Sequence, residues 1–463
     1  MPSLKRDPLW HEGNQITLLQ NGQEFFPAIC KAIDQAQKRL HLETYIFNLD
    51  DSGNSVLDAL RRACERGVRV RVVIDGFGSD VHALQIAEQL KAMRARYRIY
   101  RPKPQGWREP RLSLRRLRRL HRKMLVVDER IGFVGGINIL DDFDDVPLIN
   151  GEGRPRFDFA VRCEGPIVDD MVRAQQALWL RMAWRRRKDW DSFTQRFTLW
   201  REWRKRRQER KKAEQAGQVF EGIRASLLLR DNVRHRQQIE QAYLQLLCKA
   251  KEQVILANAY FFPGRTLRRR IEQAAERGVR VRLLLQGHAE YFLQYRACRF
   301  MYGQLLDHGI ELYEYKASYL HAKVAVIDDY SMVGSSNLDP FSLLLAREAN
   351  VLIQDQPFTQ NLQARLEYEI EHNAARVYPE LYQRLGVFSR LVDYLAYGML
   401  RLGVLLSPPQ LVQRLADAQH DLFLTCPPLL AELFTQLSRS PTVAELAART
   451  RLTEEDVLEA IES

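Results

Sequence analysis

The two halves of this 463-residue chain repeat each other, and this duplication limits the folds that the sequence can adopt. The heptapeptide ERGVRVR occupies residues 65–71 and recurs at residues 276–282. Both copies follow a stretch with helical periodicity and lead into an apolar run, which predicts a helix, a glycine stop and a buried strand. Strands that alternate with helices indicate an α/β fold. Two similar halves of one chain most simply pack about a pseudo-twofold axis and share one active site.

The duplication predicts four regions along the chain. Residues 1–180 and 216–380 form the two repeated halves. Residues 181–215, rich in Arg, Lys and Trp, form a linker between them, which is also a candidate interfacial helix. Residues 381–463 match neither half and are predicted to form a helical region.

A histidine and a lysine recur together in both halves, as His121 with Lys123 and His321 with Lys323. Each pair lies at the start of an apolar run, and strand spacing puts both side chains on the same face. Two imidazoles and two ammonium groups in one site suit a phosphodiester. One imidazole can attack phosphorus while the other protonates the leaving oxygen, and the lysines can hold the non-bridging oxygens. Because the cations are built in, we expect no metal ion and no cofactor.

An aspartate follows each histidine seven positions later, as Asp128 and Asp328. An odd spacing in a regular strand turns these side chains to the other face, so we interpret them as structural. The second hairpin is one residue shorter than the first between the aspartate and the next glycine. We expect this deletion to lie in the turn, because a slip within the strand would exchange its faces.

Small residues and an amide end the next apolar segment of each half. Asn138, Asn337 and Ser335 are the predicted phosphate-binding residues, and the adjacent glycines and serines are expected to let a ligand approach the backbone. A third strand of each half carries an acid near its start, Asp158 or Glu348. Such an acid beside a catalytic histidine would fix the tautomer and orientation of the ring.

These motifs resemble the phospholipase D superfamily, whose HxKxxxxD signature the chain carries twice. Further segments, at residues 10–22, 258–264 and 334–340, are similar to bacterial cardiolipin synthases of the B type, and the similarity covers about residues 10–375. The resemblance implies phosphatidyl transfer from one phosphatidylglycerol to another through a covalent phosphohistidine, with release of glycerol. The alternative is a phospholipase D-type phosphodiesterase that hydrolyses phospholipid or nucleic acid.

The resemblance also implies roles for individual residues. The six signature residues, Asp128 and Asp328 included, form its catalytic set. His121 corresponds to the nucleophile and His321 to the general acid and base. Asp158 and Glu348 occupy the positions of the acids that orient these histidines.

The net charge of +12 is concentrated in two segments. Residues 101–123 carry a net charge of +9, and residues 181–212 carry +10 with tryptophans interleaved among the arginines. Arg and Trp on one helical segment are typical of contact with an anionic membrane, although a solvated linker or a nucleic-acid platform has the same composition. Residues 388–408 are a second candidate for membrane contact and fit a core helix equally well.

No apolar run is long enough to cross a bilayer, and residues 1–13 contain no secretory signal. We therefore expect a peripheral protein on the cytoplasmic face of the cytoplasmic membrane, with phosphatidylglycerol as substrate rather than nucleic acid. Six cysteines show no metal-ligand spacing, which argues against a zinc module and a disulfide framework.

Overall fold

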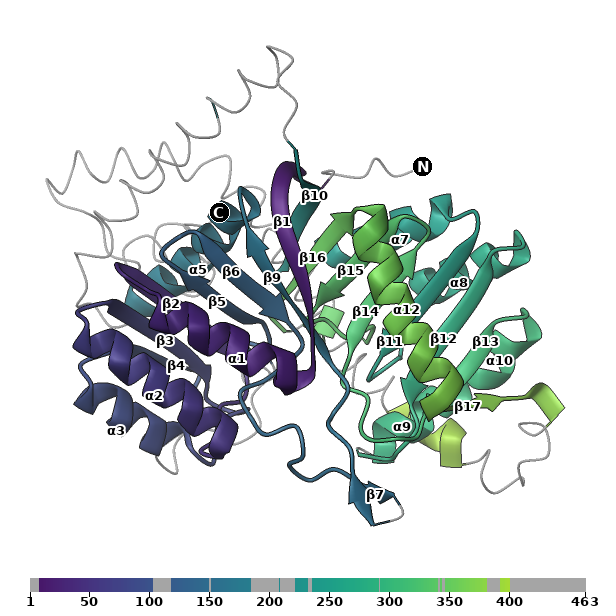
Figure 1. Cartoon of the computed structure of the whole chain (residues 1–463). Coiled ribbons are helices and arrows are strands. Elements are labelled where there is room, and N and C mark those ends of the chain that lie inside the picture. The colour runs from purple at the N-terminus through teal and green to yellow at the C-terminus, as the bar shows by residue number, and fades with distance from the viewer. Residues whose placement is uncertain are drawn as a thin grey trace, which may run out of the picture.

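The computed structural model describes residues 8–102, 118–149, 151–184, 208, 221–231, 235–290, 292–339, 342–343, 346–380 and 392–399. Most of the first basic run, nearly all of the linker and nearly all of the C-terminal region lie outside these residues. The predicted α/β fold with two repeated halves is confirmed (Figure 1).

The elements of the first half follow one another in the order strand, helix, strand. They are β1 (His11–Gln20), α1 (Asn21–Asp34), β2 (Arg39–Thr44), α2 (Asp51–Glu65), β3 (Arg69–Asp75), α3 (Ala83–Ala92), β4 (Arg96–Tyr100), β5 (Lys123–Val127), β6 (Ile131–Gly135), β7 (Leu148–Ile149), β8 (Glu152–Gly153), β9 (Phe159–Glu164) and α5 (Ile167–Trp184).

The second half repeats this order. Its elements are β10 (Ile223–Arg230), α7 (Gln238–Lys249), β11 (Gln253–Asn258), α8 (Arg265–Glu276), β12 (Arg280–Gln286), α9 (Phe292–Phe300), α10 (Tyr302–Asp307), β13 (Glu311–Tyr315), β14 (Lys323–Ile327), β15 (Tyr330–Gly334), β16 (Glu348–Gln354), α12 (Gln356–Asn373) and β17 (Ala374–Val377).

Fifteen of the described strands form one sheet, which β1 and β10 join in the middle (Figure 1). Outward from this joint, the first half runs β1-β9-β6-β5-β2-β3-β4 and the second runs β10-β16-β15-β14-β11-β12-β13, with β17 at the edge. The order is the same on both sides, as a pseudo-twofold relation requires. The strands β2, β3 and β4 are parallel, as are β11, β12 and β13.

The ERGVRVR repeats form the predicted helix stops. The helices α2 and α8 each end two residues before a glycine, Gly67 or Gly278, whose φ angle is +83° or +87°. Glycine adopts this left-handed conformation without the steric cost that a Cβ atom brings. Each chain then enters a strand, β3 or β12, as the apolar run predicts.

Both faces of each half-sheet are covered, which explains why the strands read as continuous apolar runs. On β5, Leu125 and Val127 face a core built with α1, α2 and α3, whereas Met124 and Val126 face a second core. This second core is shared, because it combines side chains of α5 and α12 with strands of both halves. In addition, β6 contacts β15 and β16, and β9 contacts β15. Packing thus holds the two halves together along the middle of the molecule.

The shorter second hairpin differs from the first only in its turn, as predicted. Met124 pairs with Val134 in the first hairpin, and Val324 pairs with Val333 in the second. The turn takes residues 128–130 in one hairpin and residues 328–329 in the other. The side chains of the second hairpin therefore point to the same faces of the sheet as their counterparts in the first hairpin.

Residues 392–399 are helical and belong to the candidate membrane-contact segment 388–408. Asp393 is buried and pairs with Arg296 of α9 at 2.7 Å, and the rings of Phe300 and Tyr397 lie 4.5 Å apart. These contacts favour the core-helix interpretation for this part of the segment, although Leu395 and Met399 are exposed. None of the helices in the described part of the chain has the length and apolar character needed to span a membrane.

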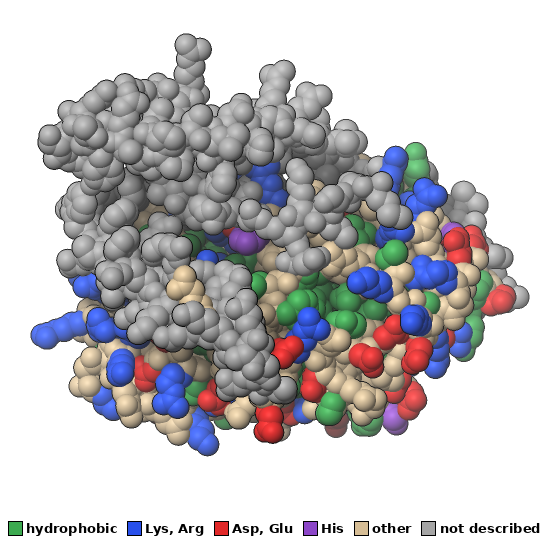
Figure 2. Space-filling view, turned by 90° about the horizontal axis from the view of Figure 1, so that it is seen from above, with side chains coloured by type: hydrophobic (Ala, Val, Ile, Leu, Met, Phe, Trp, Pro, Cys, Tyr) green, Lys and Arg blue, Asp and Glu red, His purple; other side chains and the backbone are tan. Residues whose placement is uncertain are grey.

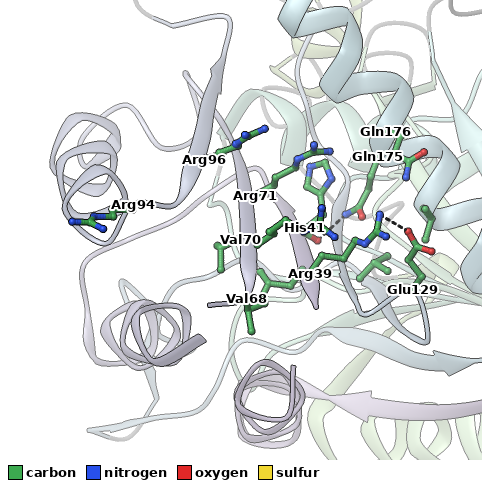
Figure 3. Close-up of a pocket in the computed structure, with 14 residues that line it drawn as sticks. Arg39, His41, Val68, Val70, Arg71, Arg94, Arg96, Glu129, Gln175 and Gln176 are labelled. Atoms are coloured by element: carbon green, nitrogen blue, oxygen red, sulfur yellow. Dashed lines mark hydrogen bonds and ion pairs between the residues drawn. The ribbon is translucent and has the colours of Figure 1, made fainter. Parts of the chain in front are cut away.

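Viewed from above, the described surface mixes Lys and Arg with acidic side chains and shows hydrophobic side chains near its middle (Figure 2). A cavity of about 560 Å³ lies in the first half, where β2, β3 and β4 begin and α5 passes over them (Figure 3). Because Lys123 lies at the far end of β2, this cavity is separate from the site of the His-Lys motifs.

Candidate active site

Short parallel bridges between the halves position the two motif histidines. The residue before each histidine pairs with the residue before the acid of the other half, as Leu120 with Arg347 and Leu320 with Phe157. The His121 amide donates to the Arg347 carbonyl at 3.0 Å, and the second motif histidine donates to Phe157 at 2.8 Å. Each histidine therefore lies beside an acid supplied by the other half.

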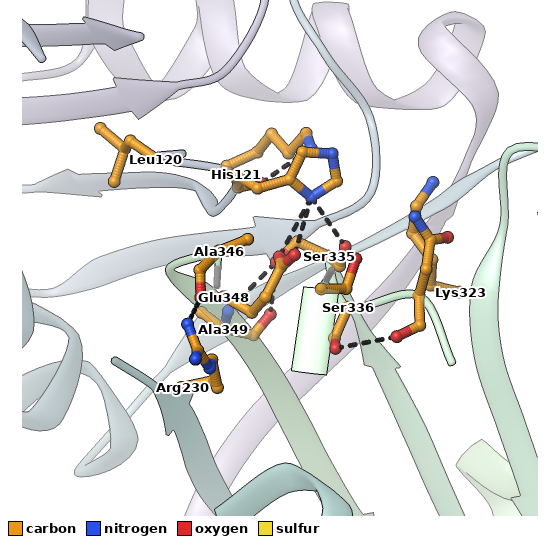
Figure 4. A network of polar contacts seen from close by, with 12 residues as sticks. Leu120, His121, Arg230, Lys323, Ser335, Ser336, Ala346, Glu348 and Ala349 are labelled. Carbon is orange, nitrogen blue, oxygen red and sulfur yellow. Dashed lines mark hydrogen bonds and ion pairs between the residues drawn. The ribbon is translucent and has the colours of Figure 1, made fainter. Parts of the chain in front are cut away.

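The imidazoles and acids form two crossed pairs. The His121 Nδ1 atom lies 3.0 Å from Glu348 Oε1 (Figure 4), and the His321 Nδ1 atom lies 2.6 Å from Asp158 Oδ2. A carboxylate at Nδ1 orients the ring and leaves Nε2 as the atom available to a substrate. Neither half alone contains a complete pair.

The two motif lysines are buried beside the histidines. Lys123 Nζ donates to the His121 carbonyl at 2.8 Å, and Lys323 Nζ lies 2.8 Å from His321 Nδ1 and 3.7 Å from Asp158 Oδ2. Lys123 also lies over the ring of Tyr45, 5.3 Å from its centroid. The site therefore combines two cations with two imidazoles and two acids.

Burial and mutual repulsion shift the titration of these groups. Burial, together with the neighbouring Lys323 ammonium, lowers the pKa of Lys123 to about 7, and burial lowers the pKa of Lys323 to about 8. Burial also raises the pKa of Asp158 to about 6. The pKa values of His121 and His321 are lowered, chiefly by burial. Such a site disfavours its own positive charge until an anion arrives, so it suits a negatively charged substrate.

Asp128 and Asp328 lie at the opposite end of their strands from the lysines, which corrects their inclusion in the catalytic set. The Asp128 carboxylate accepts backbone N–H groups of residues 37–39 at 2.7–2.9 Å. Asp328 accepts those of residues 251–253 in the same way, at 2.9–3.0 Å. Their carboxylates thus anchor the loop that enters β2 or β11, in line with the strand alternation.

Ser335 and the neighbouring glycines make close contacts with protein groups of the site. The Ser335 hydroxyl donates to Glu348 and accepts from the Ala349 amide at 3.1 Å, so it positions this acid. A Cβ atom on Gly136 would lie 2.3 Å from Asp158, and one on Gly334 would lie 2.1 Å from the Asn350 side chain. The two glycines therefore make room for these side chains, and phosphate binding by Ser335 stays a prediction.

The two predicted asparagines are buried at the ends of β6 and β15. Asn138 Oδ1 accepts from the Ile46 amide at 3.3 Å. Asn337 Oδ1 has no hydrogen-bond partner among the described residues. A buried polar atom without a partner is costly, so a ligand or water at this position would be favoured.

Asp75 and its counterpart Gln286, at the ends of β3 and β12, are buried beside the motif histidines, although no motif predicted them. Buried Asp75 accepts from the Leu120 amide at 2.7 Å, next to His121. Gln286 contacts the Leu320 amide and carbonyl at 3.4 Å, next to the second histidine. The signal was present, because in both repeats a polar residue ends the apolar run that follows ERGVRVR.

No group of three or more His, Cys, Asp and Glu side chains suited to a metal ion occurs among the described residues. The cysteines of the described ranges are free, and burial raises the pKa of Cys163 and Cys298.

Comparisons with known proteins agree with the repeated fold. The family model described as cardiolipin synthase, PLD-like domain, matches residues 29–142 and 243–370, one segment in each half. Cardiolipin synthase B of Escherichia coli (strain K12) is 37% identical over 394 residues, which cover 85% of this chain and 89% of that protein. Cardiolipin synthase B of Salmonella typhimurium is 36% identical over 92% of this chain and 96% of that protein. Cardiolipin synthase 1 of Staphylococcus epidermidis (strain RP62A) is 30% identical over 80% of this chain and 70% of that protein.

Among solved structures, phosphatidylserine synthase of Haemophilus influenzae has a similar fold. The TM-score is 0.59 at 18% identity, and the match covers 84% of this chain and 93% of that chain. The duplicated motifs, the matched family segments and the identity over most of the chain agree with one another. The chain belongs to the phospholipase D-like family of cardiolipin synthases.

Proposed function

We propose that this phosphatidyltransferase makes cardiolipin by moving a phosphatidyl group from one phosphatidylglycerol to another. The observation that carries the proposal is the crossed arrangement of two His–acid pairs around two buried lysines. This arrangement supplies a nucleophile, a proton donor and cations at one place, which is what transfer at a phosphodiester requires. The relatives named cardiolipin synthase supply the substrate class.

In the first step, His121 Nε2 attacks phosphorus and forms a phosphorus–nitrogen bond. The bond from phosphorus to the glycerol oxygen breaks, and His321 gives its Nε2 proton to that oxygen, so that glycerol leaves. The ammonium groups of Lys123 and Lys323 stabilise the charge on the non-bridging oxygens. In the second step His321 takes the proton of a hydroxyl of the second phosphatidylglycerol, and that oxygen displaces His121.

The anionic substrate changes the protonation of the site in the direction that the reaction needs. Burial, followed by the charges of the two motif lysines, lowers the pKa of His321. A bound phosphodiester compensates these charges and raises the affinity of His321 for the proton it must donate. We infer that proton uptake accompanies substrate binding.

Exposed apolar side chains on loops and helix starts at the site end of the sheet fit a bilayer that carries the substrate. Phe77, Val81 and Leu84 follow β3, Phe143 follows β6, and Phe292 opens α9 after β12. Each is more than half exposed. Because apolar groups around a site mark contact with a partner or a membrane, we propose peripheral docking on anionic lipid at the cytoplasmic face. The linker 181–215 is a further candidate contact.

The test incubates the purified full-length protein with phosphatidylglycerol vesicles and follows the lipids by mass spectrometry. We expect cardiolipin and glycerol, and activity that persists in EDTA. Phosphatidic acid as the sole product would instead establish the hydrolase, since both enzymes form the same intermediate and differ in whether an alcohol or water resolves it.

The nucleophile is tested with His121→Ala, which we expect to abolish turnover and covalent labelling by lipid. His321→Ala is the matched variant, and it should slow turnover while retaining a covalent intermediate with substrates that carry a good leaving group. Labelling of His121→Ala would transfer the role of nucleophile to His321.

A further inference from the structure

The cavity of the first half contains an arginine cluster with few acids. Arg39, Arg69, Arg71, Arg94 and Arg96 line it, together with the single acid Glu129. Within this lining, Arg39 forms an ion pair with Glu129 at 3.0 Å. No described acid pairs with Arg69, Arg94 or Arg96, each of which is exposed.

The arginines are forced together by strand register. Arg39 pairs with Arg69 across β2 and β3, and Arg71 pairs with Arg96 across β3 and β4. Neighbouring strands lie about 4.8 Å apart, and like charges directly opposite each other destabilise a sheet. This arrangement therefore costs stability unless an anion compensates it.

The second half provides an internal control, because there acids compensate the equivalent arginines. Arg280 pairs with Glu311 at 2.8 Å, and Glu311 occupies the position of Arg96 in the strand register. Arg282 pairs with Glu367 of α12 at 2.8 Å. The first half therefore carries an arginine where the second carries the acid Glu311.

Arg71, the counterpart of Arg282, packs against an aromatic ring of the helix that covers the cavity. It lies 5.0 Å from the ring centroid of Trp179 on α5. The same ring has Arg98 3.9 Å away. The Trp179 ring thus packs against two arginines of the first half, one from β3 and one from β4.

The cavity floor offers further polar groups. His41 is buried, and its Nε2 atom, which has no hydrogen-bond partner among the described residues, lies 3.7 Å from Glu43 Oε1. Figure 3 shows His41 beside Arg71, with Arg39 and Gln175 nearby and Arg94 farther out. Gln175 is fixed by its donations to the carbonyls of His41 and Met124, both at 3.0 Å. A volume of about 560 Å³ is within the range of small-molecule sites.

We propose that this cavity is a second, non-catalytic site that binds a phosphate group, either of a phospholipid headgroup or of a soluble phosphate ester. Arginine forks match phosphate oxygens in geometry and charge. Since the cavity and the His-Lys site lie at opposite ends of β2, one ligand does not fill both. The proposal is independent of the reaction proposed above.

The test compares Arg96→Glu with a charge-matched control in the full-length protein. Arg96→Glu places an acid opposite Arg71 and near Arg69, as Glu311 lies in the second half. The control is Arg270→Glu, an exposed residue of α8 that contacts Gln273. Calorimetric titrations use inorganic phosphate, glycerol phosphate, and vesicles of phosphatidylcholine with or without phosphatidylglycerol.

We expect Arg96→Glu to weaken binding at least tenfold and Arg270→Glu to stay within twofold of the original protein. If Arg96→Glu weakens binding of the soluble probes alone, the ligand is a soluble phosphate ester. If it weakens binding of the phosphatidylglycerol vesicles, the ligand is a lipid headgroup. If the two variants bind every probe with equal affinity, the proposal is overturned, whatever their catalytic activity.

A second measurement guards against a folding defect. Because Arg96→Glu relieves repulsion, its melting temperature in phosphate-free buffer should equal or exceed that of the original protein, and added phosphate should raise it less. A lower melting temperature with an unchanged phosphate-dependent rise would also refute the site.

Discussion

Replacing Glu348 by Gln tests whether the acid of one half activates the histidine of the other. The Glu348 side chain is fully buried, and its Oε2 atom lies 3.1 Å from His121 Nδ1 and accepts from the Ser335 hydroxyl. Its Oε1 atom lies 3.0 Å from the same ring nitrogen. Glutamine keeps the shape but replaces one oxygen by an N–H₂ group and removes the charge. The hydrogen bond of His121 is then no longer assisted by a carboxylate charge.

The expected loss follows from the hydrogen bond. Hydrogen bonds to charged groups contribute about 1.5–3 kcal/mol, and the positive charge on His121 grows as its ring attacks phosphorus. At about 1.4 kcal/mol for each factor of ten, phosphohistidine formation should slow by about 10- to 150-fold. Burial lowers the pKa of His121 and the Glu348 carboxylate opposes this effect, so the variant should lower that pKa further.

Single-turnover labelling with phosphatidylglycerol measures this step directly, and urea denaturation measures stability. We expect the free energy of unfolding to change by about 1 kcal/mol or less, since removal of a buried charge offsets part of the lost bonding. The control is Glu240→Gln, the same change at a partly buried acid of α7 outside the site. A Glu348→Gln protein that labels at the original rate would refute the role of the crossed pair.

Three further predictions concern the pH profile and the supports of the site. Activity should fall below about pH 6, because Asp158, whose pKa is raised, gains a proton there. It should also fall above about pH 7–8, because the two motif lysines, whose pKa values are lowered, lose their protons. A rate that does not change from pH 5 to 9 would contradict these roles. Asp128→Ala should cost about 1–2 kcal/mol of unfolding free energy in urea, because three backbone N–H donors lose their carboxylate acceptor, while the activity of the folded fraction persists. Gly136→Ala should reduce turnover at least tenfold, because the new Cβ atom would lie 2.3 Å from Asp158, and unchanged turnover would show that Asp158 has room to move.

The local features of the site could be predicted because strand and turn patterns depend on near neighbours in the chain. The period of two in a strand puts His121 and Lys123 together, and the glycine stops follow from the φ angles that Gly67 and Gly278 adopt. The internal repeat extended these predictions, since each motif appeared twice with the same spacing. The basic loop, the linker and the C-terminal region, which are the predicted membrane contacts, lie mostly outside the described residues, so these contacts stay predictions.

By itself, the sequence determined the duplicated α/β halves, the shared His-Lys chemistry and the family resemblance. Only the tertiary structure decided that Glu348 serves His121, 227 residues away, and that Asp158 serves His321, 163 residues away. It also assigned Ser335 to Glu348 and revealed Asp75 beneath the first motif histidine. The physical reason is that the sheet's middle joint brings the halves face to face. Contacts across that joint depend on packing between distant segments, which no local pattern encodes.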